Sequence, residues 1–157
     1  MKEIEYRSLC RKLSVALQQA DVDALGEQGR IEIDGVEIAL FFDEQANPDM
    51  LFCYVDMGPI PEISRTEVYE QLLAMNLLSG SKTNGVYSLD PNSGNALFVV
   101  HFMNPDTLDA AQLAEAFQVY ATQTNSLRAM LDEDSQPDSA AAPAQATGHG
   151  ASMLNLA

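Results

Sequence analysis

The sequence has little of what most metal and redox sites require. It contains no tryptophan, two cysteines (Cys10 and Cys53) and two histidines (His101 and His149). Neither cysteine belongs to a C-x-x-C pair, and neither lies near a histidine in the sequence. Zinc sites and disulfide frameworks are built from such clusters. We therefore expect two free thiols in a reducing compartment, with no metal and no other cofactor.

Basic residues are also scarce. The chain carries 8 lysines and arginines against 23 aspartates and glutamates, which gives a formal charge of −15. Between Leu13 and Ser64 there are eleven acids and one base, Arg30. An acidic surface repels phosphate groups, so we expect no nucleic-acid partner and no anionic membrane partner. The acidity fits two roles equally well: keeping the protein in solution, or attracting a basic or polar polypeptide.

Long apolar runs are absent as well. No stretch approaches the roughly 20 apolar residues that span a bilayer, and the first residues, MKEIEYRSLCRKL, lack the apolar core of a secretory signal. We therefore expect a cytoplasmic protein. Its 157 residues suffice for one domain, which we expect over residues 1–131. Residues 132–157 are rich in alanine, proline and acid, and we expect them to form a disordered tail.

The chain does contain clear periodic patterns. Apolar residues at helical spacing predict helices over residues 3–20, 64–80 and 108–131, and Ser64 with Glu67 forms a capping-box signature for the second. Alternating apolar residues predict a β-hairpin over residues 29–42 with a turn at Asp34-Gly35, and further strands over 51–57, 85–89 and 96–103. The expected order, α-β-β-β-α-β-β-α, indicates an α+β fold in which a small antiparallel sheet packs with helices.

The loop DPNSGN between the last two predicted strands has more than one interpretation. Asp90, Asn92 and Gly94 partly match a calcium loop, but the second ligand before the glycine and the glutamate at the twelfth position are missing. Pro91 and Gly94 suit the corner of a bulged hairpin, which we expect instead. Asp90 with His101 gives an alternative function, a small acidic hydrolase or metal-dependent enzyme. Because no nucleophile motif accompanies them, we expect no catalytic residue and no enzyme.

Several predicted strands are apolar on both faces. In ALFVVHFM, the alternating sets are Ala96, Phe98, Val100 and Phe102 on one side, and Leu97, Val99, His101 and Met103 on the other. Phe41, Phe52 and Tyr54 likewise fall out of phase with the apolar positions around them. A strand buried on one face alternates with polar residues. The second apolar face therefore needs a cover, which is another subunit, a bound peptide or the protein's own helices.

The segment LLAMNLLSGSKTNGVYSLDPNSGNALFVVHF, with the element order and the acidity, resembles the class I type III secretion chaperones, the Tir-chaperone (CesT-like) family, over residues 3–131. The matching positions are Leu72, Leu73, Asn76, Leu77 and Leu78, then Gly85, Leu89, Asp90 and Gly94, then residues 97–102. The resemblance implies a homodimer that binds the non-globular N-terminal segment of a secretion effector and keeps it soluble and export-competent without ATP. It also implies the secretion ATPase as a candidate partner.

The resemblance further implies two sets of site residues. The first helix and the first strands commonly receive the effector, and the second helix with the strands after it commonly forms the dimer interface. The implied effector-binding residues are Leu13, Leu17, Ile33, Phe41, Phe52 and Tyr54, and the implied interface residues are Leu73, Leu77, Leu97 and Val99. A regulator of the same fold that sequesters a protein partner is the alternative that the sequence leaves open.

Overall fold

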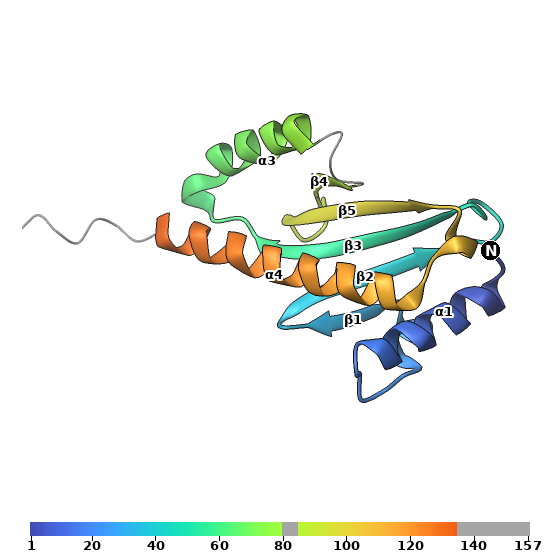
Figure 1. Ribbon diagram of the computed structural model, residues 1–157. Helices are drawn as coiled ribbons and strands as arrows, with labels where there is room; N and C mark the ends of the chain where they lie inside the picture. The colour runs from blue at the N-terminus through green and yellow to red at the C-terminus, as the bar shows by residue number, and fades with distance from the viewer. Residues whose placement is uncertain (80–84, 135–157) are drawn as a thin grey trace, which may run out of the picture.

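The computed structural model describes residues 1–79 and 85–134. It confirms an α+β fold with the expected order of long helices and strands, and adds a five-residue helix and two 3-10 helices (Figure 1). The elements are α1 (Glu3–Ala16), α2 (Ala24–Gln28), β1 (Arg30–Ile33), β2 (Val36–Phe42), β3 (Met50–Pro59), η1 (Glu62–Ser64), α3 (Arg65–Ser79), β4 (Gly85–Leu89), β5 (Asn95–Met103), η2 (Pro105–Thr107) and α4 (Ala110–Asp134).

The five strands form one antiparallel sheet in the order β1-β2-β3-β5-β4, so β1 and β4 are its edges. The β1–β2 hairpin turns at Asp34-Gly35, where φ is 50° and 76°. Positive φ at both turn residues is what a two-residue hairpin loop of type I′ requires, and it explains why the D-G pair predicted this turn correctly.

One face of the sheet is covered by α4, which crosses in front of the strands in Figure 1, and by α1, which packs beside α4, whereas α3 stands beside the β4 edge. We call the covered side the inner face and the opposite side the outer face. Strand alternation sends Leu51, Cys53 and Val55 of β3 to the inner face, where each is fully buried. Helix α1 contributes Leu13 and α4 contributes Phe117 to the same core, and both are 0% exposed. Burial raises the pKa of the Cys53 thiol to about 12.

Several helix boundaries differ from the sequence prediction, and the first helix, expected over residues 3–20, ends at Ala16. The Ser64 hydroxyl is buried and has no hydrogen-bond partner among the described residues, so the predicted capping box does not form. The turn of 3-10 helix η1 precedes α3 instead. Helix α4 begins after Asp109, whose carboxylate accepts hydrogen bonds from the Ala111 and Gln112 amides at 3.0 and 3.1 Å. Helix α4 continues to Asp134, past the expected end at residue 131, so the first three residues of the predicted tail are helical. The rest of the predicted tail, residues 135–157, lies outside the described residues.

The DPNSGN loop is a hairpin corner, as expected. The Gly94 amide donates to the Asp90 carbonyl at 2.8 Å, and Gly94 has φ 75°. The Asp90 carboxylate accepts hydrogen bonds from the Asn92 amide at 3.0 Å and the Ser93 hydroxyl at 2.7 Å. These bonds lower the pKa of Asp90, because they stabilise its charged form. The carboxylate is therefore occupied in shaping the turn.

A single arginine joins α4 to the far end of the sheet. The β3–β5 pairing shifts register between Asp56 and Gly58, which exposes backbone carbonyls at a bulge. The Arg128 guanidinium donates to the carbonyls of Met57, Asp56 and Gly35 at 2.9, 2.8 and 3.1 Å. One side chain thus donates to three carbonyl oxygens, two at the bulge of β3 and one in the β1–β2 turn.

Candidate functional site

The outer face of the sheet carries a row of aromatic rings. The register places Phe41 opposite Phe52 and Phe52 opposite His101, so three rings lie side by side across β2, β3 and β5. Ring centroids of Phe41 and Phe52 are 6.2 Å apart, those of Phe52 and Tyr54 are 6.5 Å apart, and those of Phe52 and His101 are 5.0 Å apart. We call these four residues the aromatic cluster. Phe41 is 53% exposed, so the cluster offers apolar area to a partner.

The six residues that the sequence predicted for effector binding divide into three environments. Phe41, Phe52 and Tyr54 lie in the aromatic cluster. Leu17 is half-buried and Ile33 is 9% exposed within the core, and both line a hollow of about 430 Å³ at the end of α1, beside the β1–β2 turn. Leu13 is 0% exposed because its side of α1 faces the sheet, and this burial removes it from the accessible surface. Helical spacing places Leu13 on the apolar side of the helix, and such a side has the same spacing whether it packs on the core or binds a partner.

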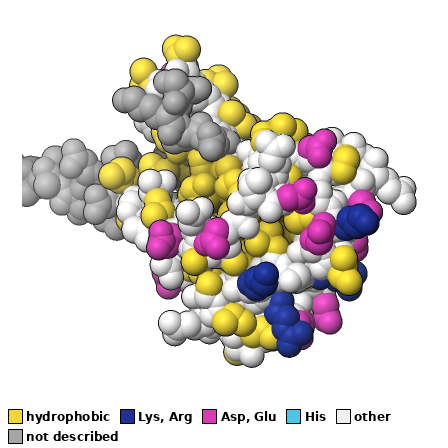
Figure 2. Space-filling model, turned by 45° about the vertical axis from the view of Figure 1, so that its right-hand side comes forward, with side chains coloured by type: hydrophobic (Ala, Val, Ile, Leu, Met, Phe, Trp, Pro, Cys, Tyr) yellow, Lys and Arg dark blue, Asp and Glu magenta, His cyan; other side chains and the backbone are white. Residues whose placement is uncertain are grey.

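The exposed side of α3 is the second apolar surface. Leu73, Leu77 and Leu78 are 69%, 84% and 76% exposed. Beside them, Tyr69, Leu72 and Leu73 line a hollow of about 400 Å³ between α3 and β4. Figure 2 shows hydrophobic side chains gathered in the recess below the lobe that α3 forms.

The four predicted interface residues come from two elements. Leu73 and Leu77 belong to the exposed side of α3, as expected of an interface. Leu97 and Val99 lie on the outer face of β5, where Leu97 is half-buried and Val99 is 8% exposed. Val86 of β4 pairs with Val99 and is itself 49% exposed, so it extends this apolar strip to the sheet edge.

Asn76 closes the free edge of β4. Its side-chain oxygen accepts a hydrogen bond from the Tyr87 amide at 2.7 Å, and its side-chain nitrogen donates to the Tyr87 carbonyl at 3.0 Å. An amide side chain that makes both bonds replaces the neighbouring strand that an edge lacks. The sequence marked Asn76 as a motif residue but gave it no role, because its partner lies in a strand whose position depends on tertiary packing.

The β1 edge is more open. The Gly29 carbonyl bonds to the Leu40 amide of β2 at 2.8 Å, so by alternation the backbone groups of Arg30 and Glu32 point away from β2. Among the described residues, one side chain meets this edge: Gln19 Nε2 donates to the Glu32 carbonyl at 3.5 Å. At that length the bond is weak, and β1 is the edge better suited to accept a further strand.

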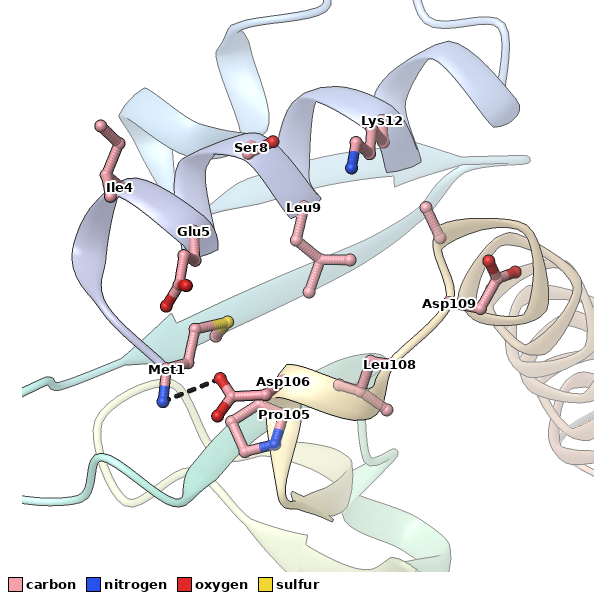
Figure 3. A pocket seen from close by; sticks show the side chains of 11 residues that line it. Met1, Ile4, Glu5, Ser8, Leu9, Lys12, Pro105, Asp106, Leu108 and Asp109 are labelled. Carbon is pink, nitrogen blue, oxygen red and sulfur yellow. Dashed lines mark ion pairs between the residues drawn. The ribbon is translucent and has the colours of Figure 1, made fainter.

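A cleft of about 490 Å³ separates α1 from the segment that leads into α4 (Figure 3). Leu9 and Leu108 face it from opposite sides, among charged residues that include Glu5 and Lys12. At its end the amino group of Met1 forms an ion pair with Asp106 at 2.9 Å. Its mixed lining sets the cleft apart from the two apolar surfaces.

The alternative enzymatic site does not assemble. Asp90 precedes β5 and His101 lies near the end of that strand, so an extended run of about 20 Å separates them. The Asp90 carboxylate is held in its own turn, and the His101 ring contacts Phe52. Within residues 1–79 and 85–134, no three His, Cys, Asp or Glu side chains are placed to hold a metal ion.

Comparison with known proteins identifies the family. The sequence profile of the Tir chaperone protein (CesT) family matches residues 11–128. A structure described as the ExsC-ExsE complex is similar with a TM-score of 0.55 at 15% identity, over 87% of this chain and 97% of the other. A structure of the HopA1-SchA chaperone-effector complex has a TM-score of 0.59 at 17% identity, over 81% and 95%. At these identities, both likenesses establish the fold. No curated protein sequence gave a significant match.

Proposed function

The chain belongs to the Tir chaperone protein (CesT) family and is a type III secretion chaperone, and we propose that the outer face of its sheet receives the non-globular N-terminal segment of an effector. The bound segment stays soluble and competent for export without ATP. A binding protein of this kind needs no catalytic residue. The observation that carries the proposal is the aromatic cluster, whose rings lie on the face opposite α1 and α4.

The two sheet edges indicate where the segment enters. Asn76 occupies the β4 edge through two short hydrogen bonds, whereas a single 3.5 Å contact from Gln19 meets the β1 edge. Strand addition supplies main-chain hydrogen bonds, and pockets for alternate side chains add selectivity. We therefore propose that part of the effector segment pairs with β1 and that a further part crosses the outer face to the aromatic cluster.

The charge of the chain defines the chemistry of the partner. With 23 acids and 8 bases, the chaperone attracts a polypeptide whose apolar side chains alternate with basic or polar ones. The charge of such a segment keeps it from folding by itself, and its apolar side chains are the part that the chaperone covers. A chaperone-effector complex among the similar structures supports this type of partner.

A homodimer is the second part of the proposal. Leu73, Leu77 and Leu78 are each more than two thirds exposed on α3, and contiguous exposed apolar side chains of this size mark an interaction surface. A second copy of the chain would cover α3 and the Leu97, Val99 and Val86 strip at the same edge of the sheet. Tyr54 of the aromatic cluster pairs with Val99 of this strip, so the two surfaces adjoin, and the rings of Phe41, Phe52 and His101 would remain accessible to the effector.

We propose a cytoplasmic location, because the effector has to be bound before it is exported. In the described part of the chain, no helix is both long enough and apolar enough to cross a bilayer. The secretion ATPase remains a predicted partner.

Site-specific photocrosslinking in the native host tests the proposed site. A photoreactive phenylalanine analogue replaces Phe41, and the same analogue at Val119 is the control, because Val119 is 50% exposed on α4. We expect crosslinks from position 41 to map to the N-terminal segment of a secreted protein and none from position 119. Equal crosslinking at both positions, or crosslinks confined to a second copy of the chain, would contradict the assignment.

A further inference from the structure

The hollow of about 400 Å³ between α3 and β4 is lined mainly by apolar and aromatic side chains. Tyr69, Leu72 and Leu73 line it from α3, and Tyr87 and Leu89 line it from β4. Leu73 is 69% exposed and Leu89 is 38% exposed, so the hollow opens to solvent. Exposed apolar surface of this kind marks a place where another polypeptide segment packs.

The lining of this hollow is uncharged. None of the described residues that line it is acidic or basic, and its polar members besides the tyrosines are Asn76 and Ser88. The Asn76 amide group is already bonded to the Tyr87 backbone on both sides. A basic segment, which the acidic surface elsewhere attracts, finds no counter-charge here. The hollow therefore favours an apolar occupant without charge.

The chain itself contains a segment of this chemistry. Residues 139–157 have no aspartate, glutamate, lysine or arginine, although the whole chain carries 31 such residues, 23 acids and 8 bases. Met153, Leu154 and Leu156 lie together near the end of this segment. Residues 135–152 contain no other large apolar side chain. The apolar character after α4 is thus concentrated in residues 153–156.

The last part of α4 lies near the hollow. Arg128 donates to the Met57 carbonyl at 2.9 Å and lies beside Gly58. Gly58 pairs with Ala96 of β5, and Ala96 pairs with Leu89 of β4, so two strand spacings, about 10 Å, separate Gly58 from the edge of the hollow. Figure 1 shows α4 ending on the same side of the molecule as the start of α3.

The intervening chain is long enough to bring its apolar end to the hollow. Helix α4 continues from Arg128 to Asp134, which adds about 9 Å. Residues 135–152 span up to roughly 60 Å when fully extended. A segment tethered at such a distance meets its site at an effective concentration of about a millimolar, so a weak contact is sufficient to hold it.

We propose that residues 153–156 of the same chain occupy this hollow, with Met153, Leu154 and Leu156 packed between α3 and β4. The hollow is built from the β4 side chains that share the phase of the inner face, because Tyr87 pairs with Phe98. The docked segment therefore leaves the aromatic cluster on the outer face free. It also leaves Leu77, which is 84% exposed and does not line the hollow, for a second copy. The inference does not rest on the proposed function.

Photocrosslinking within the purified full-length chain tests this docking. A photoreactive phenylalanine analogue replaces Leu154, and the same analogue at Ala142 is the control, because position 142 lies in the same segment without large apolar neighbours. Peptide mapping should join position 154 to residues 69–73 or 87–89, and the product should keep the 17.1 kDa mass of one chain on a denaturing gel. Position 142 should give no preferred product.

Two variants of the chain with the analogue at position 154 separate apolar docking from chance contact. Met153→Asp combined with Leu156→Asp should lower the yield at residues 69–73 and 87–89 about tenfold, because charged side chains are costly to bury. Ala140→Asp combined with Ala141→Asp adds the same charge elsewhere in the segment and should leave the yield unchanged. In ¹⁵N spectra without the analogue, the first pair of substitutions should shift the amides of the same two stretches.

Three results would overturn the docking. Crosslinks spread over the whole surface, or equal yields from the two charge variants, would show that residues 153–156 have no defined site. A product of twice 17.1 kDa would show that the segment binds a second copy rather than its own chain. Crosslinking at Phe41 concerns the opposite face of the sheet, so its outcome does not depend on this result.

Discussion

Replacing Asn76 by alanine should loosen the β4 edge and lower the free energy of unfolding. Asn76 makes two bonds to the Tyr87 backbone, at 2.7 and 3.0 Å, in a half-buried position. Each such bond stabilises by about 1 kcal/mol, and a backbone group left without a partner adds to the loss. Alanine regains roughly 0.6 kcal/mol of helix propensity in α3. The expected net loss is about 2 kcal/mol.

Urea unfolding at a fixed protein concentration measures this loss, since dimerisation makes stability depend on concentration. A loss of about 2 kcal/mol corresponds to a melting temperature lower by roughly 4–8 °C for a chain of this size. Hydrogen exchange at the Tyr87 amide should become faster than at other β4 amides. Asn92→Ala is the control, because Asn92 is exposed in the hairpin corner and should change stability by less than about 0.5 kcal/mol. A similarly small change for Asn76→Ala would refute the edge-closing role.

Three further predictions follow from other parts of the molecule. Arg128→Met removes donors from three carbonyls and should lower the unfolding free energy by about 2–3 kcal/mol in urea titration. A loss below about 1 kcal/mol would contradict the stabilising role of these three hydrogen bonds. Leu77→Glu should reduce the mass measured by light scattering from twice 17.1 kDa to 17.1 kDa. The control Val119→Glu should leave the mass of the dimer unchanged. A dimeric Leu77→Glu protein would exclude this side of α3 as the interface. Burial raises the pKa of Cys10 to about 11 and of Cys53 to about 12 from 9.0, so the unfolded chain releases these protons first. Stability should therefore fall as pH rises above 9, by about 1 kcal/mol per thiol at pH 10, and Cys53→Ala should make that fall shallower.

The parts of the fold that local chemistry controls were predictable from sequence. The Asp34-Gly35 and Asp90–Asn95 turns formed as expected because their residues encode the required positive φ and side-chain bonds. The short helix α2 was missed, since five residues carry too little periodicity to recognise. The Ser64 cap was wrong because a 3-10 turn enters α3 there.

The candidate site was predictable where strand phase decides exposure. Phe41, Phe52 and Tyr54 reached the outer face because alternation along β2 and β3 requires it. Leu13 did not reach the surface, because an apolar stripe on a helix has the same pattern whether a core or a partner covers it. The role of Asn76 and the openness of the β1 edge depend on strand order, which no local pattern contains.

The affinity of the chaperone for the effector segment identified by crosslinking tests the central claim most directly. Phe41→Ser combined with Phe52→Ser removes two rings of the aromatic cluster, and Val119→Ser combined with Met130→Ser removes two exposed apolar side chains from α4. Calorimetric titration should show the first variant binding at least about tenfold more weakly than the parent, the effect of losing buried aromatic anchors. The second should bind within about twofold of the parent, because surface changes away from an interface cost little. Equal affinities of the first variant and the parent, with the circular dichroism spectrum unchanged, would show that the outer face does not receive the effector.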